Sequence, residues 1–392
     1  TLSMMKGLWA GFDATQALYW KDGVPKRAGE TIRNPALASV LRAIAKGGAK
    51  AFYSGDNADA IQIATTGAAR NPATVSLEDL ARYIAKERPA LCGTYRVYKV
   101  CGMGPPSSGG TTILQMLGTI ERFDMKKMGK DDPRSWHVMA EAMFLAYADR
   151  EKYLGDPDFV SVPVAGLLDK AYVARRSALI SLDTSLPSYE AGNPPGAPAR
   201  TAAISGEVSG TSHFIAVDGA GNVASMTSTV EGPFGSQLLA NGYFLNNELT
   251  DFSFAPTKDG APVANRLQPG KRPLSSMSPT IVYGPDGKAI FAVGAAGGKR
   301  IIMQVMKTLV AHLDWGLSAQ DAIAAPNIFF GGEAILVEQN TPLSAMMQPL
   351  ATLGRMVVSS PIAPSKANAV ERTAKGWQGA ADPRSEGIAL DE

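Results

Sequence analysis

The chain has 392 residues, of which 45% are hydrophobic and 19% charged, as in an ordinary soluble globular protein of one large or two ordinary domains. Its 38 basic and 36 acidic residues nearly cancel, which excludes the broad basic surface of a nucleic-acid-binding protein. No apolar run reaches the ~18 residues that a membrane-spanning helix needs, so no membrane span is expected.

Up to about residue 90 the sequence predicts helices. Apolar residues recur at helical spacing between residues 34 and 46, and Ser76 opens a Ser-Leu-Glu-Asp pattern that is typical of a helix start. The first twelve residues lack the long apolar core of a secretory signal and resemble the middle of a domain. Any targeting peptide is therefore expected to lie upstream of them or to have been removed.

Residues 91–101 suit a pair of strands joined by a turn. Cys92 and Cys101 lie symmetrically in this stretch and would face each other in a hairpin, where a disulfide is geometrically possible. Two separate buried thiols are an equally weighted alternative. Two cysteines and three scattered histidines do not supply the ligands of a zinc site, so we expect no metal and no other cofactor.

Two helices and a linker are predicted next. Residues 104–110, Gly-Pro-Pro-Ser-Ser-Gly-Gly, lead into an apolar helix at 113–123, and a second helix is predicted at 135–154. From residue 187 to residue 210, Pro, Gly, Ala and Ser dominate and hydrophobic periodicity is lost. A linker or a surface loop is the expected structure there.

After residue 210 strand patterns dominate. Residues 213–218 alternate like a strand, residues 219–222 suit a turn, and residues 223–230 alternate back. Three more strands and a helix are expected at residues 242–245, 279–283, 289–293 and about 299–315. The sequence therefore predicts a mixed α/β chain.

Thr211 stands where the Gly-rich segment meets the first of these strands. If the peptide bond before it is cut, its hydroxyl becomes a nucleophile, and the freed α-amino group, with a pKa near ~8, can accept the proton. Such a residue needs no separate His and Asp. By itself this signal is weak, because Gly-Thr-Ser is a common sequence and is far more often an ordinary strand start.

Three further stretches could bind a substrate. Glu248 and Asp251 lie three residues apart, where two carboxylates could hold an ammonium group, and Ser275 and Ser276 lie in a hydroxyl-rich stretch that could bind a carboxylate. Taken alone, each is more commonly a solvated turn or a capped loop. The third stretch, residues 294–300, is Gly-Ala-Ala-Gly-Gly-Lys-Arg.

This glycine-rich stretch is not a phosphate loop. Its spacing is one residue short, and Arg stands where a Ser or Thr is needed. Gly297 and Gly298 instead precede a helix, whose first backbone amides carry partial positive charge. Such amides suit a developing oxyanion.

Taken together and in order, these stretches resemble the gamma-glutamyltranspeptidase family. The small subunit of that family is matched by residues 211–235, 245–251, 271–280 and 293–301. The large subunit is matched by residues 105–110 and by residues 146–159, Ala-Tyr-Ala-Asp-Arg-Glu-Lys-Tyr-Leu-Gly-Asp-Pro-Asp-Phe. With residues 380–384, the resemblance covers nearly the whole chain.

The resemblance implies a role for each candidate residue. Thr211 matches the nucleophile that becomes the N-terminus of the small subunit, and Thr229 matches the second threonine, which hydrogen-bonds the nucleophile. Gly297 and Gly298 match the glycines of the oxyanion hole. The implied substrate-binding residues are Glu231, Glu248 and Asp251 for the glutamyl α-amino group, and Ser275 and Ser276 for the α-carboxylate.

The implied fold is α/β, the four-layer αββα sandwich of N-terminal nucleophile hydrolases. Residues 1–186 would be the C-terminal part of the large subunit, residues 187–210 a flexible linker ending at the processing site, and residues 211–392 the small subunit, together one αββα domain. Autocleavage before Thr211 would give a heterodimer of large and small subunits from one precursor. The family resemblance also implies a periplasmic or secreted protein.

The implied activity is that of a gamma-glutamyl amide hydrolase or transpeptidase. It would act on glutathione and other gamma-glutamyl compounds through a gamma-glutamyl-threonine ester, with water, an amino acid or a peptide as acceptor. A cephalosporin acylase of the same family, which cleaves a glutaryl side chain without an α-ammonium, and an inactive homologue with a binding role are the alternatives. The three acids Glu231, Glu248 and Asp251 favour a substrate with that ammonium.

Three features depart from the family pattern. The large subunit of the family extends well upstream of what resembles Thr1, and an arginine that binds the α-carboxylate lies in that part. The stretch between Asp251 and Ser275 lacks the tyrosine that covers the site in some members. Ala295 and Ala296 replace the usual Ser-Pro before the two glycines.

Overall fold

The structure is a computed structural model that describes the chain except for residues 1–8, 10, 204–209, 362–365 and 391–392. Its backbone divides into two compact units. The first comprises Thr1–Glu87 and Thr229–Glu248, and the second comprises Arg88–Ser228 and Leu249–Glu392. The second unit holds the large sheet and most of the predicted site residues.

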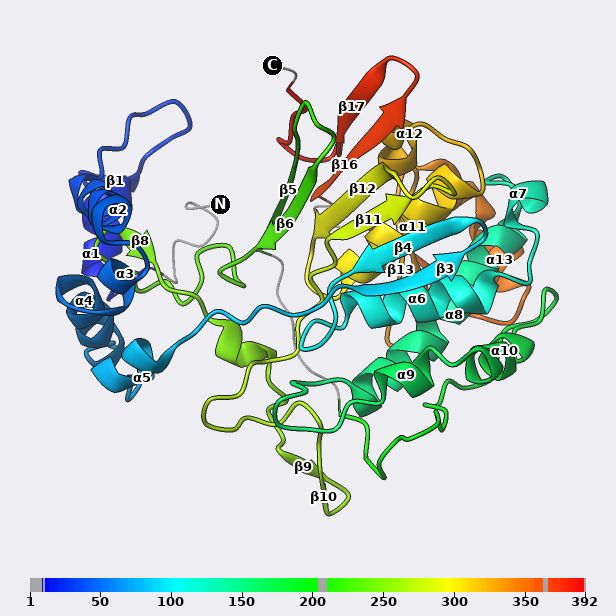
Figure 1. Ribbon diagram of the computed structural model, residues 1–392, viewed down its shortest axis with the longest axis horizontal. Helices are drawn as coiled ribbons and strands as arrows, with labels where there is room; N and C mark the ends of the chain where they lie inside the picture. Colours follow the sequence, from blue (N-terminus) through cyan, green and yellow to red (C-terminus); the bar gives the residue numbers. More distant parts are fainter. Residues whose placement is uncertain (1–8, 10, 204–209, 362–365, 391–392) are drawn as a thin grey trace. The chain divides into compact units, whose positions relative to one another are not determined.

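The first unit is mainly helical (Figure 1). Its helices are α1 (Asp13–Tyr19), α2 (Pro35–Gly47), α3 (Lys50–Tyr53), α4 (Asp56–Thr66) and α5 (Leu77–Arg82). Its strands are short and form two antiparallel pairs: β1 (Trp20–Lys21) pairs with β2 (Val24–Pro25), and β7 (Leu239–Ala240) pairs with β8 (Tyr243–Phe244). The helix predicted at residues 34–46 is confirmed as α2. The helix start predicted at Ser76 is also confirmed, because Ser76 and Asp79 cap α5 reciprocally.

The second unit is centred on a six-stranded antiparallel sheet with the order β17–β16–β12–β11–β4–β3. Its strands are β3 (Leu91–Tyr95), β4 (Tyr98–Gly102), β11 (Thr280–Tyr283), β12 (Ala289–Ala296), β16 (Lys366–Thr373) and β17 (Gly376–Ala381). Strand β4 pairs directly with β11, with Cys101 opposite Ile281. Segments from before and after the predicted linker therefore share one sheet.

A two-stranded hairpin forms a second β layer against this sheet. Strands β5 (Ser212–Val217) and β6 (Val223–Ser228) pair antiparallel and contact β12, and β5 also contacts β16 (Figure 1). In β16, Asn368 donates a hydrogen bond to the His213 carbonyl of the hairpin, whereas its neighbours Ala367 and Ala369 belong to the helix-side core. This alternation places the hairpin and the helices on opposite faces of the sheet.

The helical layer covers the other face. Helices α6 (Gly109–Ile120), α11 (Arg300–Leu313) and α12 (Ala319–Ala324) contact the sheet, and α8 (Pro133–Tyr153) packs against α6. Helix α6 begins four residues before the predicted position, at Gly109. Close packing explains this glycine, because a Cβ at residue 109 would lie 2.1 Å from the Ser278 Oγ. Hydrophobic periodicity gives no signal for this first turn, because its residues are Gly-Gly-Thr-Thr.

The remaining elements are short. The helices are α7 (Met125–Met128), α9 (Val164–Leu167), α10 (Lys170–Ala178) and α13 (Met347–Ala351), with 3₁₀ turns η2 (Glu248–Asp251) and η3 (Pro342–Met346). The strands are β9 (Thr257–Lys258), β10 (Ala261–Pro262), β13 (Ile328–Gly331), β14 (Ala334–Glu338) and β15 (Val357–Ser360). Of the predicted linker, residues 187–203 and 210 are described and contain no helix or strand.

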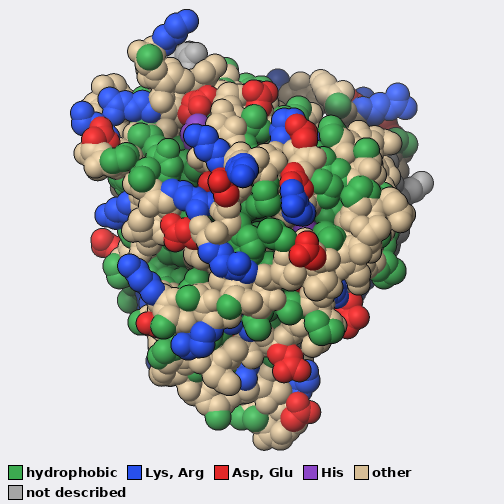
Figure 2. Space-filling view, turned by 90° about the vertical axis from the view of Figure 1, so that its right-hand side faces the viewer, with side chains coloured by type: hydrophobic (Ala, Val, Ile, Leu, Met, Phe, Trp, Pro, Cys, Tyr) green, Lys and Arg blue, Asp and Glu red, His purple; other side chains and the backbone are tan. Residues whose placement is uncertain are grey.

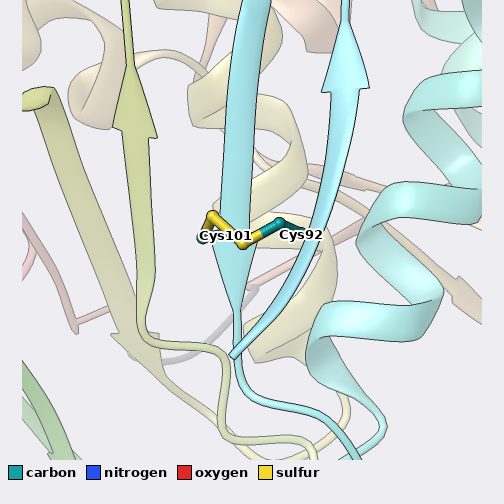
Figure 3. The surroundings of a disulfide bond; sticks show 2 residues. All are labelled: Cys92 and Cys101. Atoms are coloured by element: carbon teal, nitrogen blue, oxygen red, sulfur yellow. A yellow bond between two sulfur atoms is a disulfide. The ribbon is translucent and has the colours of Figure 1, made fainter. Parts of the chain in front are cut away.

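The two cysteines form a disulfide across the hairpin of β3 and β4 (Figure 3). Cys92 lies directly opposite Cys101 in the register of the two strands. Of the two alternatives that the sequence left open, the structure therefore has the disulfide.

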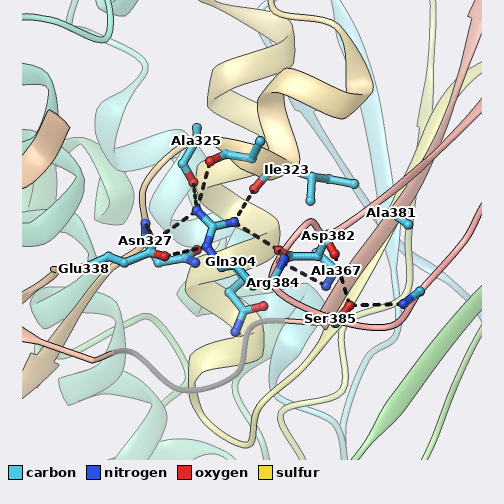
Figure 4. Close-up of polar contacts among 12 residues, drawn as sticks. Gln304, Ile323, Ala325, Asn327, Glu338, Ala367, Ala381, Asp382, Arg384 and Ser385 are labelled. Atoms are coloured by element: carbon cyan, nitrogen blue, oxygen red, sulfur yellow. Dashed lines mark hydrogen bonds and ion pairs between the residues drawn. The ribbon is translucent and has the colours of Figure 1, made fainter. Parts of the chain in front are cut away.

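The C-terminal motif at residues 380–384 holds the end of the chain to the helical layer (Figure 4). The Arg384 guanidinium donates to the Ala325 carbonyl just after α12 at 3.2 Å, to Glu338 at 3.0 Å and to Asp382 at 3.1 Å. Lys307 donates to three carbonyls at the end of α12, one of which is the Ala325 carbonyl that Arg384 also reaches. Burial is the main cause that lowers the pKa of Lys307 to about 7.

The mixed α/β architecture predicted from the sequence is confirmed. In the second unit the layers run from helices to the six-stranded sheet to the hairpin. On the face in Figure 2, Lys and Arg side chains are interspersed with Asp and Glu, in keeping with the nearly balanced charge. No helix in the described parts of the chain is long and apolar enough to cross a membrane.

Candidate active site

Thr211 and Thr229 are attached to the same end of the β5–β6 hairpin. Ser212 pairs with Ser228, Thr211 directly precedes the first of these residues, and Thr229 directly follows the second. Thr211 is buried. The sequence therefore folds so that the predicted nucleophile stands at the start of a strand, as its position after the Gly-rich segment suggested.

His213 anchors this end of the hairpin on the sheet. Its Nδ1 lies 2.8 Å from the Thr227 Oγ1, and its ring lies over Gly294 of β12, where a Cβ would come within 2.2 Å of the ring. Burial lowers the pKa of His213 to about 4, so the ring is neutral at pH 7. His213 therefore acts as a packing residue next to Thr211.

The serine pair lies on a loop that is joined to the segment before α6. The Ser275 amide donates to the Pro106 carbonyl at 3.1 Å, and the Ser275 carbonyl accepts from the amide and the hydroxyl of Ser108, each at 2.7 Å. Ser276 is buried. The two family motifs at residues 105–110 and 271–280 thus form one backbone-paired structure.

Arg150 is a residue of this site that the sequence reasoning missed. Its buried guanidinium donates from Nη2 to the Ser276 Oγ at 2.8 Å and from Nε to the Ser108 Oγ at 2.8 Å. The available signal was its place in the motif at residues 146–159. That motif gives no indication of which side chain Arg150 reaches.

Gly297 and Gly298 form the turn between β12 and α11. Both have positive φ, 139° and 59°, and their carbonyls accept from the amides of Arg300 and Ile301. Among the described residues, no group accepts a hydrogen bond from the amide of either glycine. The turn therefore presents two backbone donors ahead of a helix, as an oxyanion hole requires.

Lys299, which follows the two glycines, contacts α8 through both its side chain and its backbone carbonyl. Its Nζ lies 2.7 Å from the Glu151 Oε1, and its carbonyl accepts a hydrogen bond from the Tyr147 hydroxyl. The side chain of Lys299 is therefore committed to an ion pair.

Glu231 and Glu248 lie in the helical unit and influence each other electrostatically. Glu231 has a φ of 73°, which is uncommon for a non-glycine residue, and its amide donates to the Thr229 hydroxyl at 2.8 Å. The side chain of Asn247, next to Glu248, accepts from the amide after Glu231 at 2.8 Å. Burial, and secondly the charge of Glu231, raise the pKa of Glu248. Two carboxylates arranged in this way favour a bound cation.

Asp251 belongs to the same 3₁₀ turn as Glu248, in which side chains three residues apart lie on one side. The Asp251 carbonyl accepts from the Asn265 side chain at 2.7 Å, and the same side chain accepts from the Leu274 amide at 3.0 Å. Asn265, which the sequence reasoning also missed, therefore joins Asp251 to the residue before Ser275.

Apart from Thr211, which directly precedes β5, the structure brings the predicted residues together in two groups. Within the second unit, the serine pair, Asp251 and the glycine turn are linked through α8 and Asn265. Within the first unit, Thr229 and the two glutamates form the other group. In the described parts of the chain, no three His, Cys, Asp or Glu side chains are grouped as metal ligands would be.

Comparison with known proteins identifies relatives along the whole chain. The family model for gamma-glutamyltranspeptidase matches residues 4–391. The glutathione hydrolase proenzyme of Escherichia coli (strain K12) is 42% identical over 322 residues, which are 80% of this chain and 53% of the relative. The acylase ACY 1 proenzyme of Pseudomonas sp. (strain SE83) is 34% identical over 95% of this chain and 63% of the relative. The chain therefore spans about half to two thirds of the length of these relatives.

Solved structures share the fold. The cephalosporin acylase from Bacillus halodurans superimposes with a TM-score of 0.84 at 26% identity, covering 99% of this chain and 68% of that one. The α/β layers described above are thus those of a known architecture.

Proposed function

Since the chain belongs to the gamma-glutamyltranspeptidase family, we propose that it cleaves and transfers the gamma-glutamyl group of amides such as glutathione. Water, an amino acid or a peptide accepts the group. The chain contributes the nucleophile, the oxyanion donors and most of the substrate-binding residues of this reaction.

The observation that favours this function over that of an acylase is the pair of acids Glu231 and Glu248. Burial, and secondly the charge of Glu231, raise the pKa of Glu248, and a bound ammonium group would stabilise the carboxylate form. A gamma-glutamyl group carries such an ammonium on its α-carbon, and a glutaryl group does not. Asp251, on the same 3₁₀ turn as Glu248, would be the third partner.

In the proposed reaction, the peptide bond before Thr211 is first cut. The freed α-amino group then takes the proton from the Thr211 hydroxyl as the oxygen attacks the gamma-carbonyl carbon of the substrate. The carbonyl oxygen gains negative charge in the tetrahedral intermediate, and the amides of Gly297 and Gly298 stabilise it. Collapse expels the amine, which takes up the proton, and leaves a gamma-glutamyl ester on Thr211.

Thr229 and the serine pair position the reactants in this scheme. The Thr229 hydroxyl would hydrogen-bond the nucleophile, and Ser275 and Ser276 would hold the α-carboxylate. The acceptor then attacks the ester, and the α-amino group serves as base again. No metal or other cofactor enters any of these steps.

The proposal extends to maturation and location. Cleavage before Thr211 would give a large and a small subunit that remain together as a heterodimer in a four-layer αββα sandwich. The disulfide between Cys92 and Cys101 supports a periplasmic or secreted location, because such bonds persist in oxidising compartments.

A chromogenic test separates the candidate functions. The purified, complete protein is incubated with gamma-glutamyl-p-nitroanilide and, in parallel, with glutaryl-p-nitroanilide, and kcat/KM is measured for both. We expect the gamma-glutamyl substrate to be preferred by at least about tenfold, the effect of one charged hydrogen bond. Thr211→Ala should abolish both activities.

The second candidate function is that of a glutaryl acylase, which the likeness to two acylases favours. A preference for the glutaryl substrate would replace the proposal with this function. Absence of turnover on both substrates in cleaved protein would favour an inactive homologue with a binding role.

A further inference from the structure

Arg150, near the end of α8, contacts one residue of the serine pair directly and is linked to the other through a third serine. Its guanidinium reaches Ser276 directly, and it reaches Ser275 through Ser108, whose hydroxyl donates to the Ser275 carbonyl. The Arg150 side chain is completely buried. A buried charge of this kind requires specific partners, and these hydroxyls and a carboxylate are among them.

The chemistry of the groups fixes the direction of these hydrogen bonds. A guanidinium can only donate, so the oxygens of Ser276 and Ser108 both accept from Arg150. The proton of the Ser276 hydroxyl can then be donated only to an acceptor other than Arg150. This arrangement orients Ser276 as a donor, which is the role that a bound carboxylate needs.

The same guanidinium is tied to the oxyanion turn. Its Nη1 lies 2.7 Å from the Glu151 Oε1, and that oxygen also lies 2.7 Å from the Lys299 Nζ. Glu151 therefore connects Arg150, which contacts Ser276, to Lys299, which directly follows Gly297 and Gly298.

We propose that Arg150 is a positioning residue for the carboxylate subsite. It holds Ser275 and Ser276 in the orientation that receives the α-carboxylate of the acyl donor, and through Glu151 and Lys299 it fixes the distance from this subsite to Gly297 and Gly298. This inference rests on the proposed function. It adds a residue from the segment before the linker to a site otherwise built after it.

The test uses competitive inhibition of gamma-glutamyl-p-nitroanilide turnover by two small molecules. L-Glutamate carries the α-carboxylate, and 4-aminobutanoate lacks only that group. The variant Arg150→Lys keeps the positive charge but loses the planar guanidinium that donates to two serines at once. In this variant we expect the inhibition constant of L-glutamate to rise about tenfold or more. The constant of 4-aminobutanoate should change by less than about threefold, and KM should rise more than kcat falls.

Arg176→Lys is the matched control. Arg176 is also buried and also lies in the second unit, but its Nη2 donates to the carbonyls of Leu145 and Glu190, each at 2.9 Å. A general effect of a buried arginine on packing would appear in this variant and would affect both inhibitors equally. Equal effects of Arg150→Lys on both inhibitors would overturn the proposal.

If Arg150→Lys does not fold, Ser108→Ala provides the same test, because it removes the link from Arg150 to Ser275 while leaving the bond to Ser276. Its effect should be smaller, a few-fold, and again confined to L-glutamate; an unchanged L-glutamate constant would overturn the proposal. Lack of turnover by the wild type would instead contradict the proposed function, so the two failures are distinguishable.

Discussion

Glu248 ionises at a higher pH than an ordinary glutamate, because burial and the charge of Glu231 both disfavour its carboxylate form. As the pH falls through this raised pKa, Glu248 takes up a proton and can no longer pair with an ammonium group. The loss of substrate binding should therefore begin at a pH above the usual range for glutamate, about 4.3.

This gives a pH-dependent prediction. The profile of kcat/KM for the gamma-glutamyl substrate should have an acid limb that is absent with the glutaryl substrate, which has no ammonium. In Glu231→Gln that limb should move to lower pH, because one of the two causes that raise the pKa is removed. Titration of the Thr211 α-amino group, near ~8, should affect both substrates alike. The same acid limb with both substrates would contradict the role of Glu248.

For individual residues, the sequence predicts the candidates that contact the substrate, but it does not predict the residues that position those candidates. Ser275, Ser276, Gly297 and Gly298 lie in short ordered motifs, so their identities can be read directly. Arg150 is separated from Ser276 by more than a hundred residues, and their contact depends on where α8 ends. No local pattern encodes that distance.

Among the elements, the contact between the β5–β6 hairpin and β12 is open to a direct test. A Cβ at residue 294 would lie 2.2 Å from the His213 ring, so Gly294→Ala should force the hairpin away from the sheet. We expect a loss of about 1–3 kcal/mol in the free energy of unfolding, measured by denaturant titration, together with impaired cleavage before Thr211.

His213→Ala provides the matched comparison for this prediction. It should destabilise the wild type by leaving a cavity, but it should restore part of the stability of Gly294→Ala by removing the clash. Losses that simply add in the double variant would show that the two residues do not determine the packing.

The predictability of each element follows from its pattern. In the hairpin the burial of side chains alternates, as in a strand pair with one face on a sheet, although the apolar Phe214 and Met226 are exposed and the polar His213 is buried. The turn residues at 219–222 indicate where the two strands meet. Predicting the disulfide requires knowing the strand register, which places Cys92 opposite Cys101. That register depends on the turn between the strands, and the sequence alone does not decide it. Helix α8 is buried on nearly all sides, and its charged residues find partners far along the chain, such as Tyr172 and Gly192 for Asp149.

For the whole molecule, the proposed cleavage can be followed by electrophoresis and refolding. Wild-type protein should run as two fragments under denaturing conditions, the smaller beginning Thr-Ser-His-Phe, whereas Thr211→Ala should remain one chain. After unfolding in guanidinium chloride, the recovery of the cleaved protein should depend on protein concentration. Recovery of Thr211→Ala should not. A similar concentration dependence for both proteins would contradict this expectation.

The reason is the pairing of β4 with β11, which places strands from both sides of Thr211 next to each other in one sheet. Before cleavage, these strands find each other within one chain, and the connecting segment keeps their effective concentration high. After cleavage, the same contacts must form between two diffusing molecules, so the molecularity of folding changes from one to two. A cleaved molecule that unfolds completely at low protein concentration has thus lost the covalent connection between the two segments. The time for which it stays folded is therefore set by its rate of unfolding rather than by an equilibrium with the unfolded chain.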